Sequence, residues 1–121
     1  MNKRTMGSWY EELACMYLRS QNARILKRNF RVRSGEIDIV AFDEGYYCFI
    51  EVKYRKDNKY GGPEAAVGLS KQKQICNVSK FYLLLNHISE DVPVRYDCIA
   101  ISGEQGMAEI KWYKNAFQYR L

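Results

Sequence analysis

The sequence lacks the residues on which most small zinc-binding or disulfide-bonded domains depend. Its 121 residues include one histidine, His87, and four cysteines far apart in the chain, with no Cys-x-x-Cys pair. A zinc site needs four suitable ligands at usable spacing, so a zinc-binding fold is excluded. Each cysteine lies in an apolar stretch, where a free thiol behaves as a small hydrophobic side chain. We therefore expect Cys15, Cys48, Cys76 and Cys98 to be reduced and buried.

Long apolar runs, internal repeats and low-complexity tracts are also missing from the sequence. Because no run can cross a bilayer and the N-terminus has no apolar signal-peptide core, we expect a cytoplasmic protein without membrane contact. Hydrophobic residues make up 47% and charged residues 27% of the chain, which predicts a single folded domain over residues 1–121. The 19 Lys and Arg against 14 Asp and Glu, a net charge of +5, mildly favour a polyanionic partner.

Two runs in the first half of the chain alternate apolar with charged residues. They are Gly35-Glu36-Ile37-Asp38-Ile39-Val40 and Phe49-Ile50-Glu51-Val52-Lys53. A period of two predicts β-strands with one buried face, here over about 36–42 and 46–54. The intervening Asp43-Glu44-Gly45-Tyr46 has the composition of a short turn, so the two strands are expected to form an antiparallel hairpin.

The length of that turn decides which residues face each other. A two-residue turn at Glu44-Gly45 places Asp38 opposite Glu51 and Glu36 opposite Lys53. A three-residue loop with a glycine bulge shifts the register by one and places Asp38 and Glu51 on opposite faces, unless another bulge restores the register. The sequence is compatible with both turns.

The two-residue turn would bring two carboxylates together, which requires an explanation. Like charges directly across a ladder repel each other, and adjacent carboxylates among apolar residues are costly without a positive partner. A divalent metal ion with oxygen ligands is such a partner, and Lys53 projects from the same face as Glu51. The alternative is a solvated edge hairpin in which Glu36 and Lys53 form an ordinary ion pair, and the pattern alone does not decide between the two.

The other elements are expected on both sides of this hairpin. The sequence predicts a helix from Ser8 to about Gln21, a basic strand over 23–32 with an irregular middle near Arg28-Asn29, a long helix capped by Ser70 that ends near Asn86, and strands over 94–101 and 108–113 followed by a short tail from Asn115. The order of helix, three strands, helix and two strands predicts an α/β (α+β) fold, with a mixed central β-sheet flanked by helices.

Two details of the predicted helices concern the hairpin. Ser8-Trp9-Tyr10-Glu11 has the spacing of a capping box, yet Glu11 falls inside the apolar arc of the helix. Glu11 is therefore either a cap residue or an acid directed at the hairpin. In the second helix, Lys71 in the first turn opposes the helix dipole, which is compatible with an anionic ligand there, although a solvated lysine is the more common explanation. The buried stripe of that helix is predicted to contain Ile75, Val78, Tyr82 and Leu85, with Phe81 and Leu84 alongside.

The hairpin also carries a recognisable signature. Asp38, twelve intervening residues and Glu51-Val52-Lys53 resemble the PD-(D/E)xK pattern of restriction-endonuclease-like nucleases, whose core has the order α-β-β-β-α-β. Nearly the whole chain resembles the YraN-like family, small proteins whose endonuclease activity is inferred largely from fold and motif. The matching residues are Glu11 with Ala14, Asn29, Gly35-Glu36-Ile37-Asp38, Glu51-Val52-Lys53 with Arg55, Tyr60-Gly61, Lys71, Arg95-Tyr96-Asp97 and Asn115-Ala116-Phe117. Tyr10 departs from the family, which usually has glycine before the glutamate.

The resemblance implies a metal-dependent nuclease. Asp38 and Glu51, with the carbonyl of Val52 or of Ile50 as an extra ligand, would hold Mg²⁺ or Mn²⁺. Lys53 would orient the attacking water or stabilise the charge that develops on phosphorus. Two further acids are expected near this centre, Glu36 to tune Lys53 or join the metal shell, and Glu11 to reach in from the first helix.

The resemblance also implies a nucleic-acid partner, with DNA the leading candidate. Five basic residues would hold phosphates without reading bases, so recognition by shape is expected: Arg28, Arg33, Arg55, Lys56 and Lys71. A homodimer is compatible with the sequence, since paired sites often cut the two strands of a duplex. The rival hypotheses are a non-catalytic nucleic-acid-binding module and a partner subunit of a DNA-processing complex. Clustered acids argue against both rivals, because they repel phosphates unless a metal ion intervenes.

Overall fold

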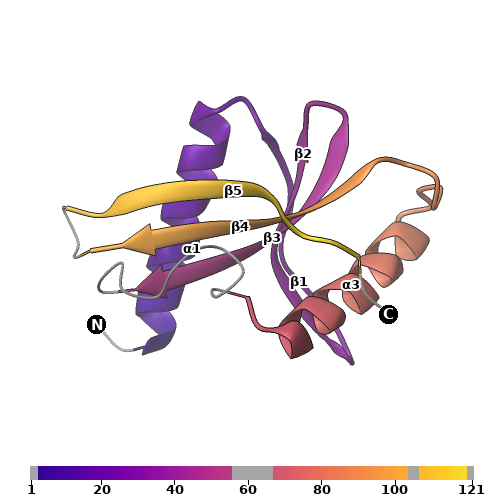
Figure 1. The fold of residues 1–121 in the computed structure, drawn as a ribbon, viewed down its shortest axis with the longest axis horizontal. Helices are drawn as coiled ribbons and strands as arrows, with labels where there is room; N and C mark the ends of the chain where they lie inside the picture. The colour runs from indigo at the N-terminus through magenta and orange to yellow at the C-terminus, as the bar shows by residue number, and fades with distance from the viewer. Residues whose placement is uncertain (1–2, 56–66, 104–106, 120–121) are drawn as a thin grey trace.

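The computed structural model describes residues 3–55, 67–103 and 107–119, with the backbone alone for residues 3–6. Across these ranges the chain forms α1 (Lys3–Ser20), β1 (Arg24–Val32), β2 (Gly35–Asp43), β3 (Tyr46–Arg55), α3 (Leu69–Leu85), β4 (Val94–Ser102) and β5 (Glu109–Phe117) (Figure 1). The α+β fold and the order of its elements confirm the prediction from sequence. No helix in the described ranges is long and apolar enough to span a membrane.

The five strands form one mixed sheet in the order β1-β2-β3-β4-β5. β1, β2 and β3 are joined antiparallel, β4 pairs parallel with β3, and β5 returns antiparallel to β4. A parallel pair needs a long crossover, and α3 lies in the connection between β3 and β4. The sheet therefore places β3, which carries Glu51 and Lys53, at its centre.

The two helices pack on opposite faces of the sheet. Cys48 and Ile50 of β3 belong to the apolar cluster of α1, whereas Phe49 between them belongs to the cluster of α3. This is the alternation expected of a strand that is buried on both faces. The four cysteines are free and buried, as predicted, and burial raises the pKa of the Cys48 and Cys98 thiols to about 12. Such thiols are unreactive at neutral pH.

The β2–β3 turn has the two-residue form. Asp43 pairs with Tyr46, and Glu44 and Gly45 between them have φ angles of 52° and 87°. Positive φ at both central residues is the type I′ turn, whose twist matches that of a hairpin. The three-residue alternative is therefore wrong, and the ladder brings Ile39 opposite Ile50, as the two-residue turn predicts.

The sheet forks immediately beyond that last pair. β2 stays paired with β1 as far as Gly35, while β3 stays paired with β4 as far as Arg55. In Figure 1, β3 and β4 accordingly run to the left, away from β1 and β2. Asp38 and Glu51 are the first residues past the last β2–β3 pair, and we call this place the fork.

Several predicted boundaries are wrong. α1 begins at Lys3, so Ser8 lies inside the helix and does not cap it. α3 has Gly68 as its N-cap, without a side-chain cap, and Ser70 is its second residue. β5 continues through the predicted tail as far as Phe117. It does so because a register shift opposite Tyr96–Cys98 and a positive φ at Asn115 let the strand bend without ending.

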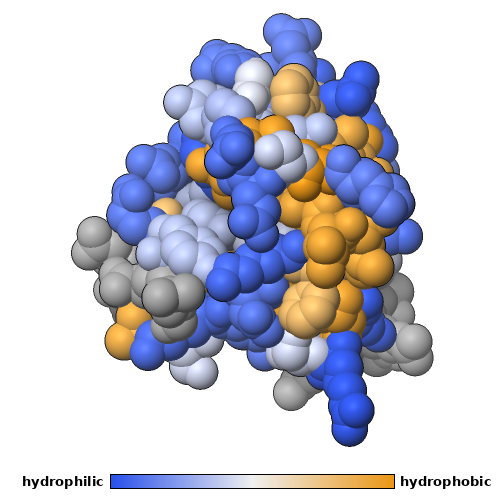
Figure 2. Space-filling view, turned by 90° about the vertical axis from the view of Figure 1, so that its right-hand side faces the viewer, coloured by the Kyte–Doolittle hydropathy of each residue, from blue (hydrophilic) through white to orange (hydrophobic). Residues whose placement is uncertain are grey.

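Ile75, Val78 and Tyr82 of the predicted stripe of α3 are buried, as expected, but its other members are not. Leu84 and Leu85 are 70% and 60% exposed, and Phe81 is exposed as well. The inward positions instead include the polar Gln72 and Ser79, which the apolar pattern could not reveal. Gln72 donates to the Val67 carbonyl at 2.8 Å, so its buried amide is satisfied. Figure 2 faces the side of the molecule on which α3 lies and shows hydrophobic side chains gathered over part of it.

Candidate active site

The Asp38 carboxylate takes the place of a backbone partner at the fork. Its Oδ2 accepts a hydrogen bond of 2.9 Å from the backbone amide of Val52. An uninterrupted antiparallel ladder would pair that amide with a carbonyl of β2. Because the side chain bridges the gap between the strands, Asp38 is held in one orientation beside Glu51. The fork and the position of Asp38 are therefore parts of one feature.

Glu51 is buried next to Asp38. The residue is 6% exposed, and it lies between Ile50, which pairs with Ile39, and Val52, whose amide donates to Asp38. Burial raises the pKa of Glu51 to about 8, and the hydrogen bond and charge of Asp38 add to this effect, against the opposing charges of Lys71 and Lys53. The Glu51 carboxyl therefore ionises less readily than that of a solvent-exposed glutamate. Its Oε2 has no hydrogen-bond partner among the described residues and lies 3.6 Å from Lys71 Nζ.

Glu11 of α1 has a buried carboxylate oxygen and lies within electrostatic range of Asp38. Burial raises its pKa, and the charge of Asp38 raises it further, whereas Arg28 and a hydrogen bond from the Asn29 side chain lower it. Its Oε1 is buried without a hydrogen-bond partner in the part of the chain described. The capping interpretation is wrong, because α1 begins at Lys3, and a role of Glu11 in the site stays a prediction. The preceding Tyr10, where the family usually has glycine, is buried and stacks on Tyr54 of β3 with ring centroids 4.0 Å apart.

Asn29 is a site residue to which the sequence assigned no role. It lies within β1 at a φ of 53°, which makes the irregular middle of this strand a real feature. The pairs on either side of it, Arg28 with Ile39 and Phe30 with Ile37, put Asn29 level with Asp38. A left-handed residue inside a strand re-aims its side chain, and asparagine adopts this conformation more readily than most residues. The irregularity therefore directs the Asn29 side chain to Glu11.

Lys53 and Glu36 do not face each other as predicted. The described β2–β3 pairs end before Glu36, which instead pairs with Arg31 of β1 and accepts a hydrogen bond of 3.0 Å from Arg31 Nε. The prediction fails because the fork separates the two strands at this level. Lys53 stays close enough to lower the pKa of Glu51, and the charge of Glu36 raises the pKa of Glu11. Both remain near the carboxylates, without the cross-strand pair.

Four of the five predicted phosphate-binding residues lie in the described part of the chain. Lys71 contacts Glu51 and donates to Gln74 Oε1 at 3.0 Å. Arg28 forms an ion pair with Glu12 of α1. Arg33 is exposed just beyond β1, and Arg55 is the last residue of β3, while Lys56 lies outside the described residues. The structure thus brings Lys71 into the site and leaves Arg33 at its edge.

The donor atoms at the fork fit a hard divalent cation. Carboxylate oxygens are the ligands that Mg²⁺ and Mn²⁺ prefer, and Mg²⁺ usually uses one or two carboxylates and keeps several waters. Glu51 Oε2 and Glu11 Oε1 are buried oxygens that lack hydrogen bonds to the described residues. Those residues contain no group of three or more His, Cys, Asp or Glu that could hold a metal ion. Asp38 and Glu51 would therefore need oxygen ligands other than side chains, and a Val52 carbonyl ligand stays a prediction.

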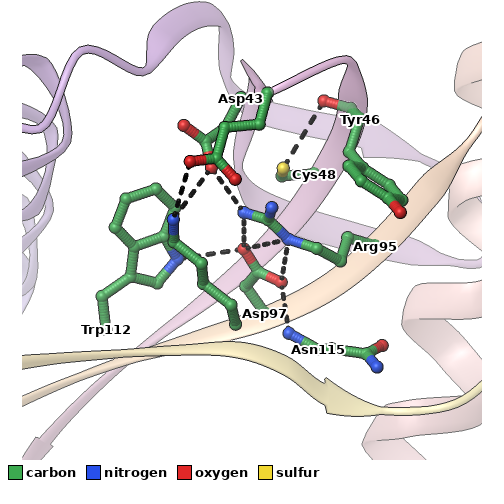
Figure 3. Close-up of polar contacts among 9 residues, drawn as sticks. Asp43, Tyr46, Cys48, Arg95, Asp97, Trp112 and Asn115 are labelled. Carbon is green, nitrogen blue, oxygen red and sulfur yellow. Dashed lines mark hydrogen bonds and ion pairs between the residues drawn. The ribbon is translucent and has the colours of Figure 1, made fainter.

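A second polar cluster lies at the turn end of the hairpin (Figure 3). Asp97 of β4 is 0% exposed and accepts hydrogen bonds from Arg95 Nη2 at 2.9 Å, Trp112 Nε1 at 2.9 Å and the Asn115 amide at 2.8 Å. Arg95 also donates to Asp43 of β2 at 3.0 Å. These donors compensate the cost of burying the negative charge of Asp97. The hydrogen bonds of the cluster also connect β2, β4 and β5.

The raised pKa of Glu51 predicts how stability depends on pH in the absence of divalent cations. The folded state holds the Glu51 proton more tightly than the unfolded chain does, so this stabilisation is present below about pH 4.5 and is lost as the pH rises through about 8. The free energy of unfolding of the wild type should fall relative to that of Glu51→Gln across this window, by on the order of a few kcal/mol. Urea titrations in EDTA at a series of pH values measure the difference, and a difference that is constant with pH would contradict it.

Known proteins match this chain over nearly its whole length. Residues 10–101 match the sequence model of a family described as "Uncharacterised protein family UPF0102". A UPF0102 protein of Lachnoclostridium phytofermentans is 46% identical over 117 residues, which are 97% of this chain and 96% of the relative. UPF0102 proteins of Colwellia psychrerythraea and Acetivibrio thermocellus are each 41% identical, over 92% and 96% of this chain and 87% and 93% of their own lengths.

Proposed function

We propose that this chain, which belongs to the UPF0102 family, is a metal-dependent nuclease that hydrolyses phosphodiester bonds in nucleic acid. The observation that carries the proposal is the carboxylate pair at the fork. Asp38 and Glu51 are the first residues past the last β2–β3 pair, Asp38 accepts a hydrogen bond from the amide of Val52, and Glu51 Oε2 is buried without a hydrogen bond to the described residues. A buried acid pair of this kind is costly unless a proton or a cation compensates it. A divalent cation between the two carboxylates would relieve that cost.

The resemblance to the PD-(D/E)xK nucleases and to the YraN-like family supports the same function. Its acids and lysine are Asp38, Glu51 and Lys53, and the first two are neighbours at the fork. The order of elements also suits the α-β-β-β-α-β core of those nucleases. The acid from the first helix, Glu11, is close enough to Asp38 for the charge of Asp38 to raise its pKa. The PD-(D/E)xK pattern is short enough to arise by chance. The neighbouring positions of Asp38 and Glu51 support it, because the proposed metal-dependent chemistry needs two carboxylates close together.

Each residue at the fork has a part in the proposed reaction. A bound Mg²⁺ or Mn²⁺ would polarise the phosphate and lower the pKa of a water molecule. Asp38, fixed by the Val52 amide, presents its carboxylate in a set orientation, and the Glu51 carboxylate would hold the cation from the other strand. The Lys53 ammonium would stabilise negative charge that develops on the phosphate or orient the attacking water. Glu11, with its unbonded oxygen, would accept a hydrogen bond from that water.

The direct test is cleavage by the pure chain of a panel of nucleic acids with Mg²⁺, with Mn²⁺ and in EDTA. The panel contains linear, single-stranded, flapped and four-way DNA and the matching RNA, because the chain is expected to recognise shape. Cleavage that needs the cation and is lost in Asp38→Ala and in Lys53→Ala supports the enzyme. Cleavage that persists in both variants indicates a contaminating nuclease. Binding without cleavage of any substrate contradicts the proposal and favours a non-catalytic binding module or a partner subunit.

A further inference from the structure

A basic groove lies beside the carboxylate pair. It has a volume of about 360 Å³ and is lined by Arg31, Val32, Arg33, Gly35, Glu36, Lys71 and Gln74. Three of these side chains are cationic and one is anionic, and the anionic Glu36 is already paired with Arg31. The lining therefore has an excess of positive charge. It shares Lys71 with the fork, so the two sites are adjacent.

The wall of the groove depends on a close approach of β2 and α3. A Cβ atom at Gly35 would lie 2.5 Å from Cγ and Cδ of Gln74, which is far inside van der Waals contact. Glycine therefore leaves room for the Gln74 side chain against the start of β2. In that position the Gln74 amide oxygen accepts a hydrogen bond of 3.0 Å from Lys71 Nζ. Gly35 and Gln74 act as positioning residues for Lys71.

Lys71 stands between the groove and the fork. Its Nζ lies 3.0 Å from Gln74 Oε1 but 3.6 Å from Glu51 Oε2, which has no hydrogen-bond partner among the described residues. The ammonium thus supplies Glu51 with a nearby positive charge without a short hydrogen bond. The Lys71 ammonium therefore lies next to Oε2, the oxygen of Glu51 that would attract a metal cation.

We propose that the groove binds a backbone phosphate of the nucleic acid. When Glu51 binds a divalent cation, the Lys71 ammonium leaves Glu51 and binds this phosphate instead. The inference rests on the proposed metal site at Asp38 and Glu51. Lys71 and a divalent cation repel each other across the short distance at Glu51, and a direct metal ligand outcompetes an ion pair at 3.6 Å. The hydrogen bond to Gln74 keeps the released ammonium at the groove. Cation and nucleic acid would then bind with positive coupling, each raising the affinity for the other by the same factor.

Binding measurements test this exchange without relying on turnover. All proteins carry Lys53→Ala, so that DNA stays intact if the chain is a nuclease. Calorimetry with MnCl₂ alone gives the affinity for the cation, and fluorescence anisotropy with a short labelled duplex gives the affinity for DNA in EDTA and in Mn²⁺. Lys71→Met removes the exchanging group, and Arg33→Met removes a groove cation that does not contact Glu51. Lys73→Met, an exposed lysine on the same helix, is the charge-matched control.

With Lys71 present, Mn²⁺ should tighten DNA binding about fivefold or more, within the usual range of coupling between two sites. Lys71→Met should bind Mn²⁺ about two- to fivefold more tightly, the value of one partly exposed ion pair, and should lose most of the coupling. Arg33→Met should weaken DNA binding by a similar factor with and without Mn²⁺, and Lys73→Met should keep the full coupling. If Mn²⁺ binds but Lys71→Met keeps both its affinity and the coupling, the exchange is wrong and the metal site stands. If no Mn²⁺ binds even with Lys53 restored, the exchange and the proposed function fall together.

Discussion

Asp38→Asn and Lys53→Met are each expected to reduce cleavage of nucleic acid by at least about a hundredfold, the usual loss on removing one electrostatic partner of a transition state. Asp38→Asn keeps the shape of the side chain, and the amide oxygen can still accept the hydrogen bond from the Val52 amide. It removes the negative charge that a divalent cation needs at the fork. Lys53→Met removes the cation that would face the charge developing on the phosphate, while retaining most of the apolar length of the side chain.

Single-turnover cleavage rates with excess protein measure this loss, since they separate chemistry from substrate binding. Glu44→Gln, an exposed acid in the turn of the same hairpin, and Lys27→Met, an exposed lysine on β1, are matched controls and should retain the wild-type rate. DNA affinity in EDTA should change little in Asp38→Asn, which separates loss of chemistry from loss of binding. Equal rates in Asp38→Asn and in Glu44→Gln would remove Asp38 from the reaction.

Asp97→Asn is expected to destabilise the fold by about 3–5 kcal/mol, the range for removing one partner of a buried ion pair. The carboxylate is 0% exposed and receives donors from Arg95, Trp112 and the Asn115 amide. An asparagine keeps the shape but leaves the Arg95 guanidinium with less negative charge, and its amide group adds donors where acceptors are needed. One substitution would thus weaken the connection between β2, β4 and β5.

Chemical denaturation of Asp97→Asn gives this loss directly, with Asp91→Asn, an exposed aspartate in the loop before β4, as the control. The control should change the free energy of unfolding by less than about 0.5 kcal/mol. Under native conditions Asp97→Asn should still bind Mn²⁺ as the wild type does, because the hydrogen bonds of Asp97 go to Arg95, Trp112 and the Asn115 amide and not to residues of the fork. A change in stability below about 1 kcal/mol would mean that the cluster contributes little net stabilisation, as some buried ion pairs do.

The sequence predicts the site where local signals are sufficient. Glu44-Gly45 indicates a turn, and one of the two turns compatible with it brings Asp38 to Glu51, so the pair could be proposed from sequence while the choice of turn needed the structure. The role of Glu11 is ambiguous from sequence. It lies three residues after Ser8, as in a capping box, and it also falls inside the apolar arc of the helix. The start of α1 at Lys3 removes the capping interpretation, and nothing in the local pattern marks that start.

The errors arise where pairing depends on distant parts of the chain. Alternation continues past Asp38, so the sequence predicts a continuous ladder and pairs Glu36 with Lys53. The fork results from β1 holding β2 while β4 holds β3, which no local pattern encodes. The hydrogen-bonded cluster around Asp97 could not be predicted for the same reason, since its donors come from two different strands, β4 and β5. Asn115 is predicted to begin a tail after the last strand. In the structure it has a positive φ, β5 continues past it, and its backbone amide donates a hydrogen bond to Asp97.

The central claim, that the carboxylates of the fork hold a divalent cation, is tested most directly by calorimetric titration with MnCl₂. The full chain is titrated at a pH above the Glu51 pKa of about 8, and again at neutral pH in two buffers that differ in ionisation enthalpy. We expect one Mn²⁺ to bind, with release of up to one proton at neutral pH, and no binding by Asp38→Asn or Glu51→Gln. Binding that is as tight in both variants as in the wild type, or no binding by the wild type, would contradict the account.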